Sequence, residues 1–127
     1  MTYKEVATMI KGIGYPCAYY QFPEGTEQTC PFICFYFTRS NDLAADDTNY
    51  QKIRQLAVEL YTDNKDFAKE ETVEDALNAS GLVFSREESY IDSERMYMVT
   101  FITEVVVTDE VITTEETITT EENNNNG

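Results

Sequence analysis

The first segment of the chain has the spacing of a helix that buries one face. Its apolar residues follow one another at intervals of three or four positions, and these are Val6, Met9, Ile10 and Ile13. That spacing predicts a short amphipathic helix. Thr2 followed three residues later by Glu5 is a capping-box pattern, which satisfies free amides where a helix begins. Gly12 or Gly14 offers the left-handed residue at which many helices end.

The next segments have the patterns of strands. Residues 17–22 are rich in Tyr and Phe, which is typical of a strand. Residues 32–38 are apolar at both odd and even positions, so we expect both faces of this strand to be covered and place it at the centre of the sheet. From residue 50 the pattern alternates as in a half-buried strand, with one apolar face formed by Leu56, Val58 and Leu60.

The second half of the chain predicts a helix and two more strands. The helix is expected from about Asp66 to Ala79, with Gly81 as its stop signal. Its inward positions are Val73, Ala76 and Leu77, and its charged, solvent-facing positions are Lys69, Glu70, Glu71, Glu74 and Asp75. Strands are expected over residues 82–88 and 95–107, and the odd positions of the second one form an apolar face.

The predicted order of elements is helix, three strands, helix, two strands. Strands joined by hairpins, with two helices packed on one face, indicate an α+β domain whose mixed or antiparallel sheet has about five strands. We assign residues 1–108 to this single domain and expect residues 109–127 to be an acidic, flexible extension. The extension repeats a Thr/Glu-rich hexad at 111–116 and 117–122. It has few apolar groups to offset an ordering cost of about 1–2 kcal/mol per residue, although its Thr and Ile residues favour pairing with an edge strand.

The charge of the chain excludes several classes of function. Nine basic and 24 acidic residues give a net charge of −15. A surface of this kind repels phosphate backbones and anionic lipid headgroups, so we exclude a sequence-specific nucleic-acid reader and a membrane binder. The N-terminus does not have the pattern of a signal peptide, and no apolar run approaches the roughly 20 residues of a membrane span. We expect a protein made and kept in a reducing compartment, with its thiols free.

The residue types available for catalysis are few. The chain has no His, which removes Ser–His and Cys–His pairs and His-ligated metals. Cys17 and Cys34 are expected to be small buried side chains on neighbouring strands. Adjacent carboxylates are expected to be solvated surface, and Asp42, Asp46 and Asp47 do not follow the spacing of a calcium loop. The sequence therefore predicts a protein that is not an enzyme and uses no cofactor or metal.

Aromatic residues are the unusual feature that remains. The chain has 9 Tyr and 7 Phe but no Trp, and many of them lie within residues 19–22 and 32–37. Aromatic side chains at both odd and even positions cannot all fit on one side of a single sheet. Either two layers cover the sheet, or an uncovered face meets another subunit.

Four segments carry a resemblance to a known family. They are Pro31–Tyr36, Asn49–Ile53, Glu59–Phe67 and Tyr90–Tyr97. They resemble the small tail-terminator, or tail-completion, proteins of long-tailed phages of Gram-positive bacteria, over about residues 1–108. The resemblance implies an α+β subunit of the virion that forms a six-membered ring on the head-proximal end of the tail tube. Its partners would be copies of itself, the major tail tube protein and a head–tail connector or stopper protein.

Two sets of residues are assigned to this expected role. Contacts with other subunits or with the tube are expected near the loops 23–31 and 40–49, from Tyr19, Tyr20, Glu24, Asn41, Leu43, Asp46 and Asp47. An acidic channel lining, which would repel the genome DNA and let it pass without specific binding, is expected from Asp42, Glu87 and Glu88. Two alternatives remain open: a head-completion or adaptor protein that binds the portal, and an acidic, monomeric module directed at a host protein.

Overall fold

The computed structural model describes residues 1–26, 28–41, 43–44 and 50–108. They form an α+β fold with one mixed sheet, as the sequence predicted. The helices are α1 (Tyr3–Lys11) and α2 (Phe67–Ala79); the strands are β1 (Cys17–Tyr19), β2 (Phe32–Ser40), β3 (Leu43–Ala44), β4 (Tyr50–Thr62), β5 (Phe84–Ile91) and β6 (Met96–Val107). The strand order is β1-β2-β4-β6-β5, and β3 pairs with β4 off this path. The β1–β2 pair is parallel and the other pairs are antiparallel.

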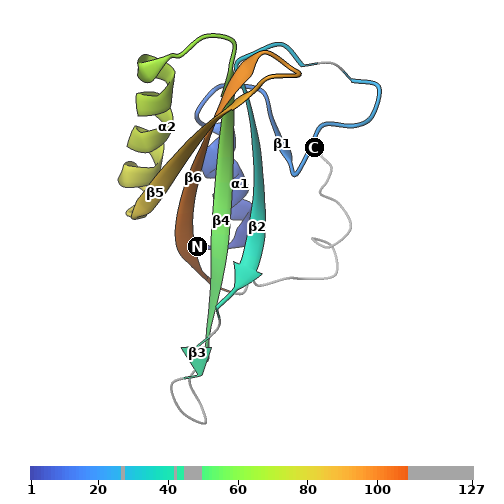
Figure 1. Cartoon of the computed structure of the whole chain (residues 1–127). Helices are drawn as coiled ribbons and strands as arrows, with labels where there is room; N and C mark the ends of the chain where they lie inside the picture. Colours follow the sequence, from blue (N-terminus) through green and yellow to red (C-terminus); the bar gives the residue numbers. More distant parts are fainter. Residues whose placement is uncertain (27, 42, 45–49, 109–127) are drawn as a thin grey trace.

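One face of the sheet carries the hydrophobic core. The predicted apolar face of β4 is confirmed, because Leu56, Val58 and Leu60 are at most 1% exposed. Val58 lies between Phe35 of β2 and Phe101 of β6 in the sheet register. Both helices pack onto this face, and they contribute Val6, Ile10, Val73 and Leu77 to the core. Figure 1 shows α1 behind the sheet and α2 beside β5. Neither helix of the described residues lies on the other face, which we call the helix-free face.

The beginning of the chain is held against the end of β6. The capping box of α1 is present, since the Thr2 side chain accepts a hydrogen bond from the Glu5 amide and Glu5 accepts one from the Thr2 amide. The Met1 ammonium donates to the Val106 carbonyl at 2.9 Å, and the Thr108 amide donates to the Met1 carbonyl at 2.9 Å. The last described residue of the domain therefore lies next to the N-terminus of α1.

Several elements differ from the sequence prediction. The strand β2 is not central, because the longer β4 lies between β2 and β6. The strand β1 ends at Tyr19, since Tyr20 has a φ of 70° and leaves the extended conformation. Gly12 ends α1 in a right-handed conformation, and the left-handed residue is Gly14. The predicted loop after residue 40 contains the short strand β3.

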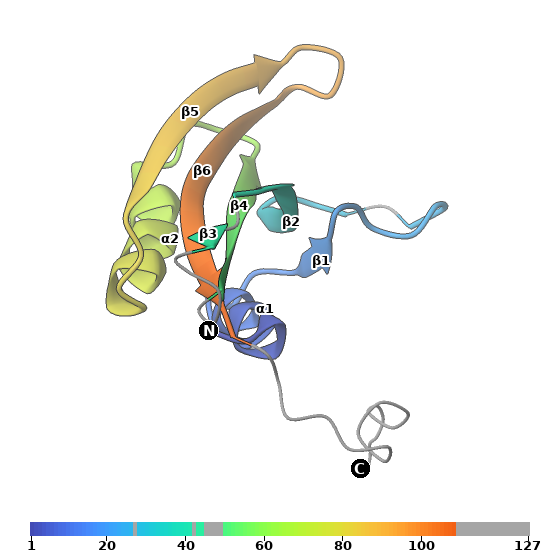
Figure 2. The same cartoon turned by 90° about the horizontal axis from the view of Figure 1, so that it is seen from below.

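The sheet is curved rather than flat. Figure 2 shows β5 and β6 bending together, and it shows the segment between β1 and β2 extending away from the sheet on the side opposite α2. The two ends of the strand order thus have different surroundings. One end packs against α2, and the other carries the short strand β1 and an aromatic-rich segment. None of the helices in the described ranges is long and apolar enough to cross a membrane.

Candidate interaction surfaces

The described residues contain no arrangement suited to a metal ion or a reactive thiol. No group of three or more Cys, Asp or Glu side chains in the described ranges could hold a metal. The three cysteines are free. Burial raises the pKa of Cys17, and burial together with nearby carboxylates raises the pKa of Cys30 and Cys34 to about 11. A thiol with a pKa this far above neutral is rarely in its nucleophilic thiolate form.

The helix-free face of the sheet is organised around one carboxylate. Glu59 of β4 accepts a hydrogen bond from the Tyr36 hydroxyl at 2.6 Å and another from the Tyr61 hydroxyl at 2.7 Å. The hydrogen bond to Glu59, together with burial, raises the pKa of Tyr36 to about 12. Burial, followed by the hydrogen bond to Glu59, raises the pKa of Tyr61. Both phenols thus stay neutral donors to a charged acceptor, which makes these hydrogen bonds strong.

Further aromatic rings extend this arrangement into one patch. Tyr20 meets Tyr36 edge to face at 5.3 Å, Phe32 stacks on Tyr61 at 4.6 Å, and Phe22 meets Phe32 edge to face at 5.6 Å. We call these five residues the aromatic patch. The aromatic side chains that the sequence placed on both faces of β2 are therefore divided between the core and this patch.

Tyr20 is the most exposed member of the aromatic patch. Its side chain is 63% exposed, and its φ of 70° is unusual for a residue other than Gly, Asn or Asp. Left-handed backbone at a bulky residue is costly and is concentrated at functional positions. Exposed aromatic rings are also enriched in protein–protein interfaces. The arrangement is therefore suited to contact with another protein.

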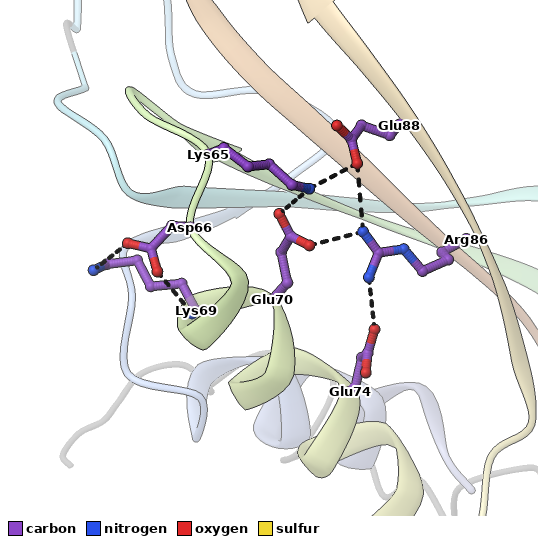
Figure 3. A network of polar contacts seen from close by, with 7 residues as sticks. All are labelled: Lys65, Asp66, Lys69, Glu70, Glu74, Arg86 and Glu88. Atoms are coloured by element: carbon purple, nitrogen blue, oxygen red, sulfur yellow. Dashed lines mark hydrogen bonds and ion pairs between the residues drawn. The ribbon is translucent and has the colours of Figure 1, made fainter.

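The helix-covered face carries a second carboxylate with a different environment. Glu70 of α2 is 1% exposed and accepts from Lys65 Nζ at 2.6 Å and from Arg86 Nη2 at 2.7 Å (Figure 3). Arg86 also donates to Glu74, and Lys65 also donates to Glu88. This network joins α2 to β5.

The predicted solvent-facing position of Glu70 is wrong. Arg86 lies opposite Phe101 in the register of β5 and β6, and its guanidinium lies over the ring of Phe101, so the cation points to the face that α2 covers. Two cations close to one carboxylate offset the cost of removing its charge from water. The hydrogen bond to Glu70 raises the pKa of Arg86 against the opposing effect of burial. Burial lowers the pKa of Lys65, but the hydrogen bonds to Glu70 and Glu88 more than offset it and leave that pKa raised. The network is a structural connection with no free catalytic group.

The residues predicted to form an interface lie in several places. Tyr19 and Tyr20 are exposed at the end of β1, and Glu24 is exposed in the segment that follows. The Asn41 side chain donates to Glu104 at 3.3 Å, and Leu43 begins β3. Asp46 and Asp47 are outside the described residues. The structure therefore brings Tyr19 and Tyr20 together at one edge of the sheet, away from Asn41 at the far end of β2.

The predicted channel residues do not share one surface. Glu87 and Glu88 are neighbours on β5, so their side chains point to opposite faces. Glu88 lies opposite Val99 on the helix-covered face, where it contacts Lys65. Glu87 lies opposite Thr100 on the helix-free face and is exposed. Asp42 is outside the described residues.

The pairing partners of Glu59 and Glu70 were not predicted from the sequence. A signal for Glu59 was available, because it is the acidic position on a strand face where Tyr61 is its neighbour two residues on. No comparable signal marks Glu70. It belongs to a run of charged residues, each of which could face solvent. Its burial follows from the position of Arg86, which is 16 residues away in the sequence.

Comparisons with known proteins show a similarity of fold. No protein-family model matches the chain, and no curated protein matches it. A solved structure described as the virion of a native gene transfer agent particle contains a chain that matches with a TM-score of 0.52 and 15% sequence identity. The match covers 80% of this chain and 84% of that chain. The chain therefore shares its fold with a protein of a virion particle.

Proposed function

We propose that this protein is a structural component of a phage virion that forms a ring at the head-proximal end of the tail tube. There it ends tube polymerisation and joins the tail to the head connector. The observation that carries the proposal is the fold shared with a chain of a virion particle over most of both chains. The resemblance of four segments to tail-terminator proteins supports the position in the tail.

The two ends of the strand order support assembly from identical subunits. A ring arises from head-to-tail contacts between different surfaces of each copy. The aromatic patch and the exposed edge of β5 are two such surfaces, at opposite ends of the strand order. Tyr20 supplies the exposed aromatic anchor of the first surface. Partners in this proposal are further copies of the chain, in a six-membered ring, the tail tube protein and a connector or stopper protein.

The charge of the chain supports passage of DNA through such a ring. A net charge of −15 repels phosphates, whereas basic residues would release counterions from DNA and bind it. Glu87, exposed on the helix-free face, is the described acidic residue that we assign to the channel lining. A ring whose channel is lined by Lys52, Arg54 and Arg86 would contradict this assignment.

The decisive experiment is negative-stain microscopy of particles produced without the protein. Tails much longer than normal support the terminator role, because tube growth then has no stop. Heads that leak DNA, with tails of normal length, support the alternative of a head-completion or adaptor protein that binds the portal. Particles of normal form, with the protein found as a monomer outside virions, contradict both and favour a host-directed module. Restoring the intact protein in trans is the control.

A further inference from the structure

A groove of about 560 Å³ lies on the helix-free face, at the end of the sheet that carries the aromatic patch. One side comes from the segment between β1 and β2, which contributes Phe22, and the other from the turn between β5 and β6, which contributes Glu94. The strands contribute Phe32 and Tyr61. Figure 2 shows both segments on the side of the molecule away from α2. A volume of this size is in the range of clefts that bind ligands.

Aromatic rings and carboxylates occur together at this groove. The ring of Phe32 stacks on that of Tyr61, with centroids 4.6 Å apart. Glu94 lines the groove and is exposed. Glu59 lies beside the groove, because it accepts a hydrogen bond from the Tyr61 hydroxyl and pairs in register with Cys34, another lining residue. The face of an aromatic ring and a nearby carboxylate both attract a cation.

Elsewhere in the molecule the same combination is filled by a cation of the chain itself. The Arg86 guanidinium lies over the ring of Phe101 and donates to Glu70. At the groove, by contrast, no ion pair within the described ranges joins Glu59 or Glu94 to a Lys or Arg side chain. Arginine suits such a place best, because its planar guanidinium stacks on aromatic faces and pairs with a carboxylate through two hydrogen bonds.

A second copy of the chain is a poor source of this arginine. The chain has 24 acidic side chains and only four arginines. Arg86 is held in the network of Figure 3, and Arg39 and Arg54 line a separate pocket beside α1. Arg95 follows Glu94 in the same turn and so belongs to the groove itself. The net charge of −15 instead attracts a basic partner of another kind.

We propose that this groove binds an arginine side chain of a different protein, presented on a basic segment. The guanidinium lies against the rings of Phe32 and Tyr61 and pairs with Glu94, and the charge of Glu59 adds to the attraction. The binding itself does not depend on the proposed function. In the proposed virion, the arginine belongs to a neighbouring protein of the particle and not to another subunit of the ring.

Titration of the full-length protein with short peptides, followed by NMR, tests the binding. The probes are the tripeptide Gly-Arg-Gly, blocked at both ends, and the same peptide with citrulline, which has nearly the shape of arginine but no charge. We expect the arginine peptide to bind with a Kd of about 1–10 mM, about tenfold tighter than the citrulline peptide. The signals of Phe22, Phe32 and Met96 should shift most. Equal affinities for the two peptides overturn the proposal, and so does the absence of binding at about 30 mM.

Charge-removing variants separate the groove from a general attraction to an acidic protein. E94Q is expected to weaken binding of the arginine peptide about threefold, and E59Q/E94Q to reduce it to the affinity of the citrulline peptide. The matched control E71Q removes the same charge from an exposed position of α2 and should leave the affinity unchanged. The signal of Val58 in the core reports that each variant is folded. If E71Q weakens binding as much as E94Q, net charge alone holds the peptide and the proposal fails.

Sedimentation of E94Q distinguishes a different protein from a second copy. If another copy supplied the arginine, E94Q would lower the fraction of oligomer formed by the purified protein, and that result overturns the assignment to a different protein. An unchanged oligomeric state, together with weaker peptide binding, supports it. The peptide titration does not require a place in the tail, so it can succeed or fail independently of the microscopy of particles that lack the protein.

Discussion

The two faces of the sheet each hold a carboxylate within hydrogen-bond reach of two donors, but the donors differ. Glu70, on the helix-covered face, is bound by the cations of Lys65 and Arg86 and is almost completely buried. Glu59, on the helix-free face, is bound by the neutral hydroxyls of Tyr36 and Tyr61 and is half-buried. The first arrangement balances the charge of Glu70 and connects α2 to β5. The second leaves a negative charge within an aromatic surface.

Because of this difference, we expect the face with Glu70 to govern the stability of the fold and the face with Glu59 to govern contacts with a partner. A buried charge that loses its partners is costly, so we expect the Glu70 network to contribute to the stability of the folded protein. We expect the half-buried charge of Glu59, beside partly exposed rings, to tolerate substitution better than Glu70. Substitutions on the two faces should therefore act on different properties, unfolding on one face and assembly on the other.

The largest effect is expected from Glu70→Ala. The substitution leaves Lys65 and Arg86 as like charges beside a new cavity, and we expect the free energy of unfolding to fall by about 3 kcal/mol. Chemical denaturation with an unchanged m-value measures it. The control Glu71→Ala, at an exposed neighbouring position, changes stability by less than about 0.5 kcal/mol. Equal effects of the two substitutions would show that the network does not stabilise the fold.

A smaller loss of stability is expected from Glu59→Ala. It removes the acceptor of Tyr36 and Tyr61, but both tyrosines are neutral and only partly buried, so we expect a loss of about 1–2 kcal/mol. Chemical denaturation measures it, with Glu87→Ala on the same face as the control. A loss as large as that for Glu70→Ala would contradict the distinction between the two faces.

The pH dependence of stability is expected to differ between the protein and Tyr36→Phe. The pKa of Tyr36 in the folded state is raised to about 12 from an ordinary value of 10.0. Its contribution is therefore fully present below pH 10 and is lost as the pH rises through about 12. Unfolding curves over this range should converge for the two proteins at high pH. Curves that stay parallel would show that Tyr36 does not contribute through its proton.

Tyr20→Ala is expected to have the smallest effect on stability and a large effect on assembly. The side chain is largely exposed, so the free energy of unfolding changes by less than about 0.5 kcal/mol. Formation of rings, followed by sedimentation and microscopy, should fail because the exposed aromatic anchor is missing. The control Phe67→Ala removes another exposed aromatic ring, at the start of α2 and outside both proposed ring surfaces, and should leave ring formation intact. Intact rings in Tyr20→Ala would remove the aromatic patch from the interface.

Local patterns predicted most of the elements because the relevant forces act between residues that are close in sequence. The capping box of Thr2 and Glu5 and the period of α1 depend on residues within one or two turns. The start of α2 near Asp66 is likewise local, because the Asp66 side chain accepts a hydrogen bond from the Lys69 amide. The alternation that predicted β4 requires one buried face, and the core supplies it. These features are confirmed.

The candidate surfaces were less predictable because they combine distant segments. The roles of Tyr19 and Tyr20 at an interface remain predictions, and so do those of Glu87 and Glu88 in a channel. The sequence alone did not show which of Glu87 and Glu88 lies on the helix-covered face. That depends on which face of β5 packs against α2. It also did not show that Phe22 and Glu94 line one groove, since this depends on the strand order.

By itself, the sequence determined the class of the fold, the positions of most helices and strands, the acidic character of the surface and the lack of His-based chemistry. These follow from composition and from periods of two and 3.6 residues, which act locally. The tertiary structure alone decided the strand order, the burial of Glu70, the binding of Glu59 by two tyrosines and the groove on the helix-free face. Each of these requires partners many residues apart, and such pairing is selected by the packing of the whole sheet rather than by any one segment.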